Sequence, residues 1–261
     1  AYEYSSGGNI SITGLGGVSI SSDITSFPYG GSSGAITINS GNATHTINGV
    51  NNGQTAGVFY CNSFYKKGSG VFAIKSANTI LYSTNINQGT LKIVTLNTIP
   101  ISNTLTIDAD GTLDMNGKNF TIASLQGAGN VVSNIAGALT FTTGSANANT
   151  TFSGAFNESS AVLNITKLGT GKLILSGSSY YTGTTLVNAG TLNIQNDGAL
   201  GTSSLVTLNA VNTYLELESS TSPINIESTP IKINGGLVNY PYESSTLKNI
   251  SGDNIWSSNI I

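Results

Sequence analysis

Three aspartates form the densest acidic group of the chain, and such a group could do chemistry. Asp108, Asp110 and Asp114 share one short segment, and paired carboxylates can hydrolyse polysaccharide or hold calcium. Alternatively, Asp108 and Asp110 flank a turn at Gly111, where Asp favours local backbone bonding, and Asp114 is an outward strand residue. The chain has no Arg and only one distant His to assist the acids, so the second interpretation is preferred.

Nucleophilic and metal-binding side chains are scarce. His45 is the only His and Cys61 the only Cys, so no intrachain disulfide and no Cys/His metal cluster can form. A catalytic Ser would need His45 as its base, and no Ser is identifiable as its partner. The Gly-Ser-Gly and Gly-Thr-Gly triplets ending at Gly70 and Gly171 precede no helix, so they are corners rather than phosphate loops. We therefore expect no enzyme, and no catalytic, cofactor-binding or metal-binding residues.

A group of Tyr residues lies in polar Gly/Ser contexts, outside the apolar pattern described below. Exposed aromatic rings suit stacking on sugars or docking onto another protein. Equally, they can cover the corners of a fold, and the sequence leaves both alternatives open. The residues are Tyr2, Tyr4, Tyr29, Tyr180, Tyr181, Tyr240 and Tyr242.

Charge is low throughout the chain. Only 8% of residues are charged, against about 25% in an average soluble protein. The net charge is −3, and all nine basic residues are Lys, whereas a nucleic-acid binder needs a basic patch and normally Arg. Gly, Asn, Ser and Thr interrupt every apolar stretch, which excludes membrane insertion of this segment.

The elements that must position these residues are strands. Helical periodicity is absent, and a Gly-x-apolar-x-apolar pattern recurs at steps near 18 to 22 residues, or about twice that. Such alternation points one face inward and the other to water. Its copies begin at Gly8, Gly16, Gly34, Gly70, Gly89, Gly111, Gly137, Gly171 and Gly190.

A longer repeat accompanies this pattern. At a shift of 101 residues, 68–74 matches 169–175 and 87–93 matches 188–194. We therefore predict an all-β fold, a right-handed single-stranded parallel β-helix with coils of about 18–26 residues, whose stacked coils share one core. It should run as one continuous solenoid over 1–261, with more irregular terminal coils over 203–261, where several Pro residues occur.

The register makes specific positions testable. Gly171 and Gly190 should occupy equivalent corners of successive coils, and at least one should have positive φ. Leu192 should face the core, so replacing it by Asp should unfold its coil. Asn193 should face outward and tolerate Val.

One part of the chain closely resembles the passenger-associated transport strand repeat of bacterial autotransporter passenger domains. The matching segments are 137–141, 151–155, 165–177, 181–194 and 198–202, with a degraded copy over 67–126. The resemblance implies a right-handed parallel β-helix within a passenger located at the cell surface or in the extracellular space. It does not fix the activity, because the repeat is a shared scaffold. The family's translocator barrel is not part of this sequence, so we expect a mature passenger or a piece of one.

Three kinds of function fit this pattern. The leading hypothesis is a surface adhesin or structural stalk, with a host-cell protein or glycan as partner. The second is a self-assembling extracellular fibre subunit that stacks end to end on itself. The third is a polysaccharide-degrading β-helix enzyme that uses Asp108, Asp110 and Asp114. A viral fibre with a β-helix is a further alternative, because such fibres share the low charge and the scarcity of Cys.

Overall fold

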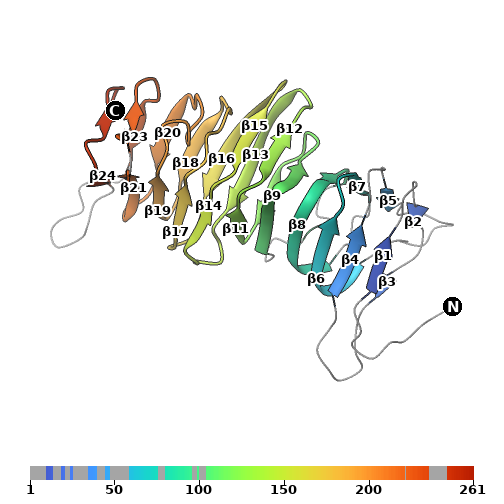
Figure 1. Ribbon diagram of the computed structural model, residues 1–261. Helices are drawn as coiled ribbons and strands as arrows, with labels where there is room; N and C mark the ends of the chain where they lie inside the picture. The colour runs from blue at the N-terminus through green and yellow to red at the C-terminus, as the bar shows by residue number, and fades with distance from the viewer. Residues whose placement is uncertain are drawn as a thin grey trace.

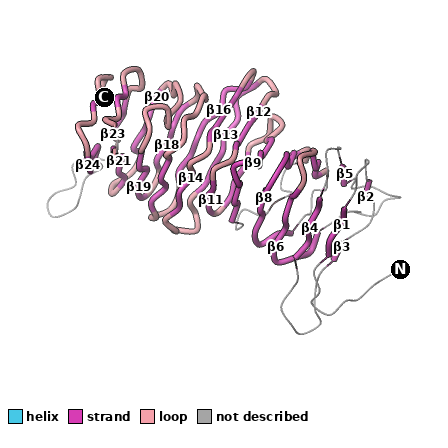
Figure 2. Tube along the Cα trace, in the orientation of Figure 1, coloured by secondary structure: helices cyan, strands magenta, loops and turns pink. Residues whose placement is uncertain are grey.

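The computed structural model consists of parallel strands stacked along one long axis. It describes residues 10–13, 19–20, 24–25, 35–39, 45–47, 59–75, 80–95, 99, 104–220, 222–234 and 246–261. The first strands lie at one end of the stack and the last at the other, as Figure 1 shows. Short loops join the strands, and no helix occurs in the described ranges (Figure 2). None of those residues therefore forms a helix that could cross a membrane.

Most strands are short, as expected where Gly, Asn and Ser break the chain every few residues, and β6, β8 and β9 are longer. Their bounds are β1 (Ile10–Thr13), β2 (Ser19–Ile20), β3 (Ile24–Thr25), β4 (Ala35–Asn39), β5 (His45–Ile47), β6 (Phe59–Lys67), β7 (Val71–Ile74), β8 (Ile80–Ile93), β9 (Thr104–Asp114), β10 (Phe120–Ile122), β11 (Ser124–Gly127), β12 (Asn130–Ser133), β13 (Gly137–Thr143), β14 (Thr150–Phe152), β15 (Ala155–Glu158), β16 (Ala161–Lys167), β17 (Lys172–Leu175), β18 (Thr184–Val187), β19 (Gly190–Ile194), β20 (Leu205–Leu208), β21 (Thr213–Glu218), β22 (Asn225–Ile226), β23 (Ile231–Ile233), β24 (Thr246–Ser251) and β25 (Ile255–Trp256).

From β9 onward, the described coils have three faces. One face is the sheet β10-β13-β16-β18-β20-β23. The other two belong to one large sheet, because the long strand β9 pairs with β11 through its first half and with β12 through its second. The pairings between described strands are parallel, and Leu173 pairs with Leu192, which in turn pairs with Leu215. The predicted parallel β-solenoid is confirmed.

The apolar members of the repeated pattern fill the interior. Leu192 is 0% exposed, and its partners Leu173 and Leu215 are buried as well. Aromatic rings continue the core from coil to coil: Phe141 lies 5.4 Å from Phe156, and Phe156 lies 6.2 Å from Tyr181, between ring centroids. The burial of Leu192 confirms the inward assignment.

The two corner glycines are required for different reasons. Their strands pair in register, with Lys172 opposite Thr191, so the two corners are equivalent as predicted. Gly190 has φ of 65°, which favours glycine. Gly171 is not left-handed, but a Cβ there would lie 2.3 Å from the carbonyl oxygen of Ala148. Glycine is therefore required at Gly190 by positive φ and at Gly171 by the close approach of the neighbouring coil.

Asn193 corrects the sequence prediction. It alternates with Leu192 and Ile194, so it points away from the core, yet it is 0% exposed. Its amide donates to the carboxylates of Glu216 and Glu218, at 3.0 and 2.8 Å. The expectation that Asn193 is an exposed strand position was wrong, because outward position and solvent exposure are different properties.

The coils near the C-terminus pair with local irregularity. The pairing of β21 with β24 shifts register between Leu217 and Glu218. Farther on, β22 pairs with β25, and Ile231 bridges to Ile260. Pro230 contributes its carbonyl oxygen to Val206 N–H, 2.9 Å away, so this proline sits where only an acceptor is needed.

Candidate functional site

Two of the three aspartates of the acidic segment have different partners, and the third, Asp110, is exposed. Asp108 accepts a hydrogen bond from the side chain of Asn87, 2.8 Å away on the preceding coil. Asp114 accepts from the backbone N–H of Asn116 and lies 3.5 Å from the Lys92 ammonium. Strand β9 runs through Gly111, where a turn was expected, and the local backbone bond is made by Asp114 instead of Asp108 or Asp110. The described residues contain no group of three His, Cys, Asp or Glu placed to hold a metal ion.

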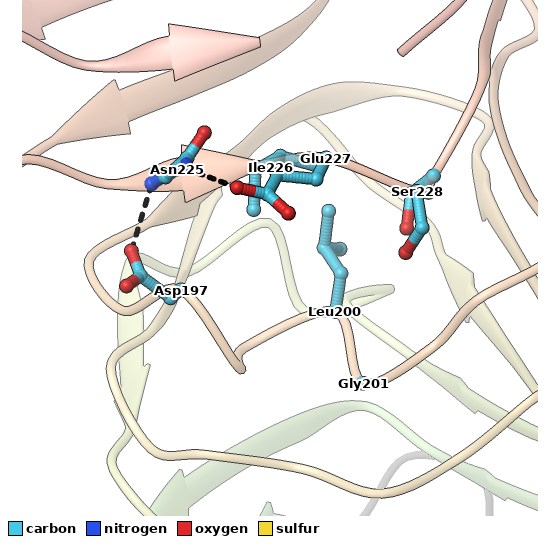
Figure 3. A pocket seen from close by; sticks show the side chains of 8 residues that line it. Asp197, Leu200, Gly201, Asn225, Ile226, Glu227 and Ser228 are labelled. Atoms are coloured by element: carbon cyan, nitrogen blue, oxygen red, sulfur yellow. Dashed lines mark hydrogen bonds between the residues drawn. The ribbon is translucent and has the colours of Figure 1, made fainter. Parts of the chain in front are cut away.

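A hollow of about 210 Å³ lies between β22 and the turn that precedes β20. Asp197 and Glu227 contribute carboxylates to it, as Figure 3 shows, and Leu200 and Ile226 contribute apolar side chains. Asn225 joins the two acids: its backbone N–H donates to Asp197 at 2.8 Å and its amide donates to Glu227 at 2.7 Å. Sequence reasoning missed this group, because Asp197 and Asn225 come from different coils.

The carboxylates of this hollow serve the fold directly. Each accepts a hydrogen bond from Asn225, so the network holds β22 onto the turn carrying Asp197. A glycosidase needs one acid whose pKa is raised and a second carboxylate across the substrate. Here both Asp197 and Glu227 are exposed. This arrangement favours a structural tie over a catalytic pair.

Two lysines are buried inside the solenoid, and sequence reasoning passed over both. Lys66 in β6 is 0% exposed and Lys167 in β16 is 1% exposed. The Lys66 ammonium donates to the carbonyl oxygens of Lys67, Gly68 and Gln88, at 2.9, 2.6 and 2.9 Å. The ammonium is therefore bound by backbone alone, at a corner where two coils meet.

The second lysine has the same surroundings. The Lys167 ammonium donates to the carbonyl oxygens of Leu168, Gly169 and Ala189, at 2.7, 2.8 and 3.1 Å. Burial lowers the pKa of both ammonium groups to about 8, while three acceptors favour the charged form, which alone has three N–H donors. The shift of 101 residues seen in the sequence relates every partner of one lysine to a partner of the other, and could have revealed the pair.

A charged group covers the outer face of β17, β19 and β21. Lys172 lies 2.6 Å from Glu216, and Lys248 lies 3.8 Å from the centre of the Tyr214 ring. Burial raises the pKa of Glu216, but its bonds to Lys172 and Asn193 and nearby positive charges outweigh this and lower the pKa overall. The group joins four successive strands, β17, β19, β21 and β24, through side chains.

The two neighbouring tyrosines have opposite environments. Tyr180 is 71% exposed, whereas Tyr181 is 0% exposed, so of the two alternatives left open by the sequence only Tyr180 fits the exposed one. The Tyr181 hydroxyl lies 2.7 Å from the Thr185 hydroxyl, which lies 3.2 Å from that of Ser203. Burial raises the pKa of Tyr181 despite these bonds.

The other residues singled out in the sequence are placed less fully. His45 lies in β5 and Cys61 in β6, and their side chains lie outside the described part of the structure. The remaining tyrosines of the polar group lie outside the described residues: Tyr2, Tyr4, Tyr29, Tyr240 and Tyr242.

Three exposed apolar side chains lie in or before three strands of one face. Ile135 is 50% exposed, Val162 44% and Tyr180 71%. Ile135 precedes β13, Val162 belongs to the start of β16, and Tyr180 precedes β18. These strands are consecutive in their sheet, so the three side chains come from successive coils, and the three residues together are named here the apolar corner.

Comparisons with known proteins agree with this architecture. The passenger-associated transport repeat matches residues 64–93 and 165–194, which confirms the repeat and its shift. The adhesin BmaC autotransporter of Brucella suis biovar 1 (strain 1330) is 30% identical over 218 residues, or 82% of this chain. The chain spans only 6% of the length of that relative. No solved structure matches.

Proposed function

The chain belongs to the autotransporter passengers that carry passenger-associated transport repeats, and from this we propose that it acts as an adhesive segment of a surface-displayed or secreted passenger. The observation that carries the proposal is the similarity of this chain, over 82% of its residues, to the BmaC adhesin. The solenoid supplies a rigid rod, and its outer side chains supply contacts. A structural stalk is the minimal form of the same function.

We infer further that the chain is not an enzyme. The Asp108, Asp110 and Asp114 carboxylates have separate local partners or lie exposed, and the Asp197 and Glu227 carboxylates fix Asn225. A catalytic pair would instead need two acids whose environments move their pKa values apart. When the chain is incubated with polysaccharide, we therefore expect that it releases no reducing sugar.

The apolar corner is the contact that we propose for a host-cell protein or glycan. Exposed aromatic rings stack on sugars and dock onto protein surfaces, and Tyr180 is the most exposed large apolar side chain described. Ile135 and Val162, the other members of the apolar corner, add exposed apolar side chains on successive coils. The low charge of the chain suits a partner that is not recognised through charge.

Binding of the purified chain to cultured host cells and to a glycan array tests this proposal. Beads coated with the chain should attach more than beads coated with albumin, and soluble chain should compete. Val162→Ser and Tyr180→Ser should weaken attachment, whereas Val211→Ser, which alters a side chain of similar exposure (47%) elsewhere, should not. If beads coated with the chain attach no better than beads coated with albumin, the adhesive role is rejected and the structural stalk is the function that is left.

A further inference from the structure

The two buried lysines point to a binding site built into each repeat. We propose that each repeat contains a carbonyl cage for a primary ammonium group, and that Lys66 and Lys167 fill it in cis to lock two successive coils at one corner. This inference goes beyond the adhesive function and does not depend on it. It concerns how the passenger coils are held together.

The cage is complete without any charged partner. Each ammonium has three backbone carbonyl acceptors within 3.1 Å, which is the full donor capacity of the group. The ion pairs found among the described residues involve other lysines, Lys92 and Lys172. Three oxygen dipoles that converge on one point favour a cation there.

Each cage spans two coils. Two of its carbonyls follow the lysine directly, and one of these belongs to Gly68 or Gly169, whose φ values of 74° and 69° turn the chain at the corner. The third carbonyl comes from the next coil, at Gln88 or Ala189, immediately before Gly89 or Gly190. Removing the ammonium would leave converging carbonyls without a donor, which is costly when they are buried.

Packing alone does not require lysine at these positions. Lys66 pairs with Ile38 and Ile86 in adjacent coils, and Lys167 pairs with Thr143 and Val187. Residues without a charged head group therefore occupy the same inward column in the neighbouring coils. The lysine methylenes continue this column. The carbonyl cage explains why the side chain also carries an ammonium group.

The first experiment compares Lys167→Met with Lys232→Met by thermal melting and hydrogen exchange. Met keeps an unbranched side chain that is one heavy atom shorter than Lys, and it removes the three donors. Lys232 is an exposed lysine of β23. Lys167→Met should lower amide protection over 165–194 about tenfold to a hundredfold, since charged hydrogen bonds are lost. Lys232→Met should leave protection unchanged, and unchanged protection in both variants would overturn the proposal.

The second experiment refills the cage from solution. Lys167→Ala should melt at a higher temperature as n-propylammonium is added, because that ion has a hydrocarbon tail and three N–H donors. Tetramethylammonium carries the same charge without donors, so it should have little effect. Equal stabilisation by both ions would show a general salt effect and reject the cage.

A third measurement needs no variant and covers the case in which the substituted chains fail to fold. Reductive methylation of the native protein, followed by peptide mass spectrometry, should modify Lys66 and Lys167 much more slowly than the other lysines. Denatured protein should lose this protection. Modification of the two lysines at the rate of exposed ones in the native protein would contradict the proposal.

Discussion

At the scale of single residues, strand alternation says which way a side chain points but not what covers it. Asn193 points outward and is nevertheless fully buried beneath Glu216, Glu218 and Lys172. Tyr181 and Tyr180 are adjacent in sequence and differ completely in exposure. Predictions for individual positions therefore follow from the neighbouring coils.

Asn193→Val should destabilise the chain. The change removes the donor shared by Glu216 and Glu218 and leaves two close carboxylates to repel, at a cost of about 1 to 3 kcal/mol. Thr191→Val, on the same outward side of β19, is the control, because Val suits a partly exposed strand position. Thermal melting compares them, and equal melting temperatures would show that the amide bonds contribute nothing.

Glu216 should make stability depend on pH in acid. Its folded pKa is lowered because bonds from Lys172 and Asn193 outweigh the effect of burial. A group whose folded pKa is depressed adds stability above its unfolded pKa, near 4.5, and that stability is lost as pH falls through the folded value. Melting temperatures of wild type and Glu216→Gln should therefore differ at pH 7 and converge as the pH falls below 4.5 through the folded pKa of Glu216. A difference that stays constant from pH 7 into acid would contradict this prediction.

At the scale of an element, corners are set by the approach of neighbouring coils. Gly190→Val should be strongly destabilising, because φ is positive and a Cβ would lie 2.6 Å from the Gly169 carbonyl oxygen. Strain from the backbone alone is about 1 to 3 kcal/mol, and the clash adds to it. Thr191→Val serves as the adjacent control in thermal melting. A Gly190→Val protein as stable as that control would mean that this corner can open freely.

At the scale of the whole molecule, each coil contacts mainly its two neighbours, so damage should stay local. Leu192→Asp places an unpaired carboxylate in a fully buried site, which costs several kcal/mol. Amide protection should be lost in β17, β19 and β21 and retained in β8 and β9, as measured by hydrogen exchange. Uniform loss along the chain would indicate one cooperative unit instead. Thr191→Asp, outside the core, should leave both regions protected.

Much of this architecture was predictable from the sequence. The Gly-x-apolar-x-apolar pattern identified inward residues such as Leu173 and Leu192, because alternation along a strand is fixed by backbone geometry. Spacing then predicted their pairing, since each coil must return to the same face before stacking. The shift of 101 residues and the family resemblance followed from the same repeat.

Only the tertiary structure decided the polar contacts. The burial of Asn193, the tie from Asn225 to Asp197 and the cages around Lys66 and Lys167 each join residues from different coils. Their partners depend on the loop lengths and φ values at the corners, which set how one coil lies on the next. Local sequence encodes the direction of a side chain, whereas the atoms that meet its polar end come from about 20 residues away, beyond the reach of any local pattern.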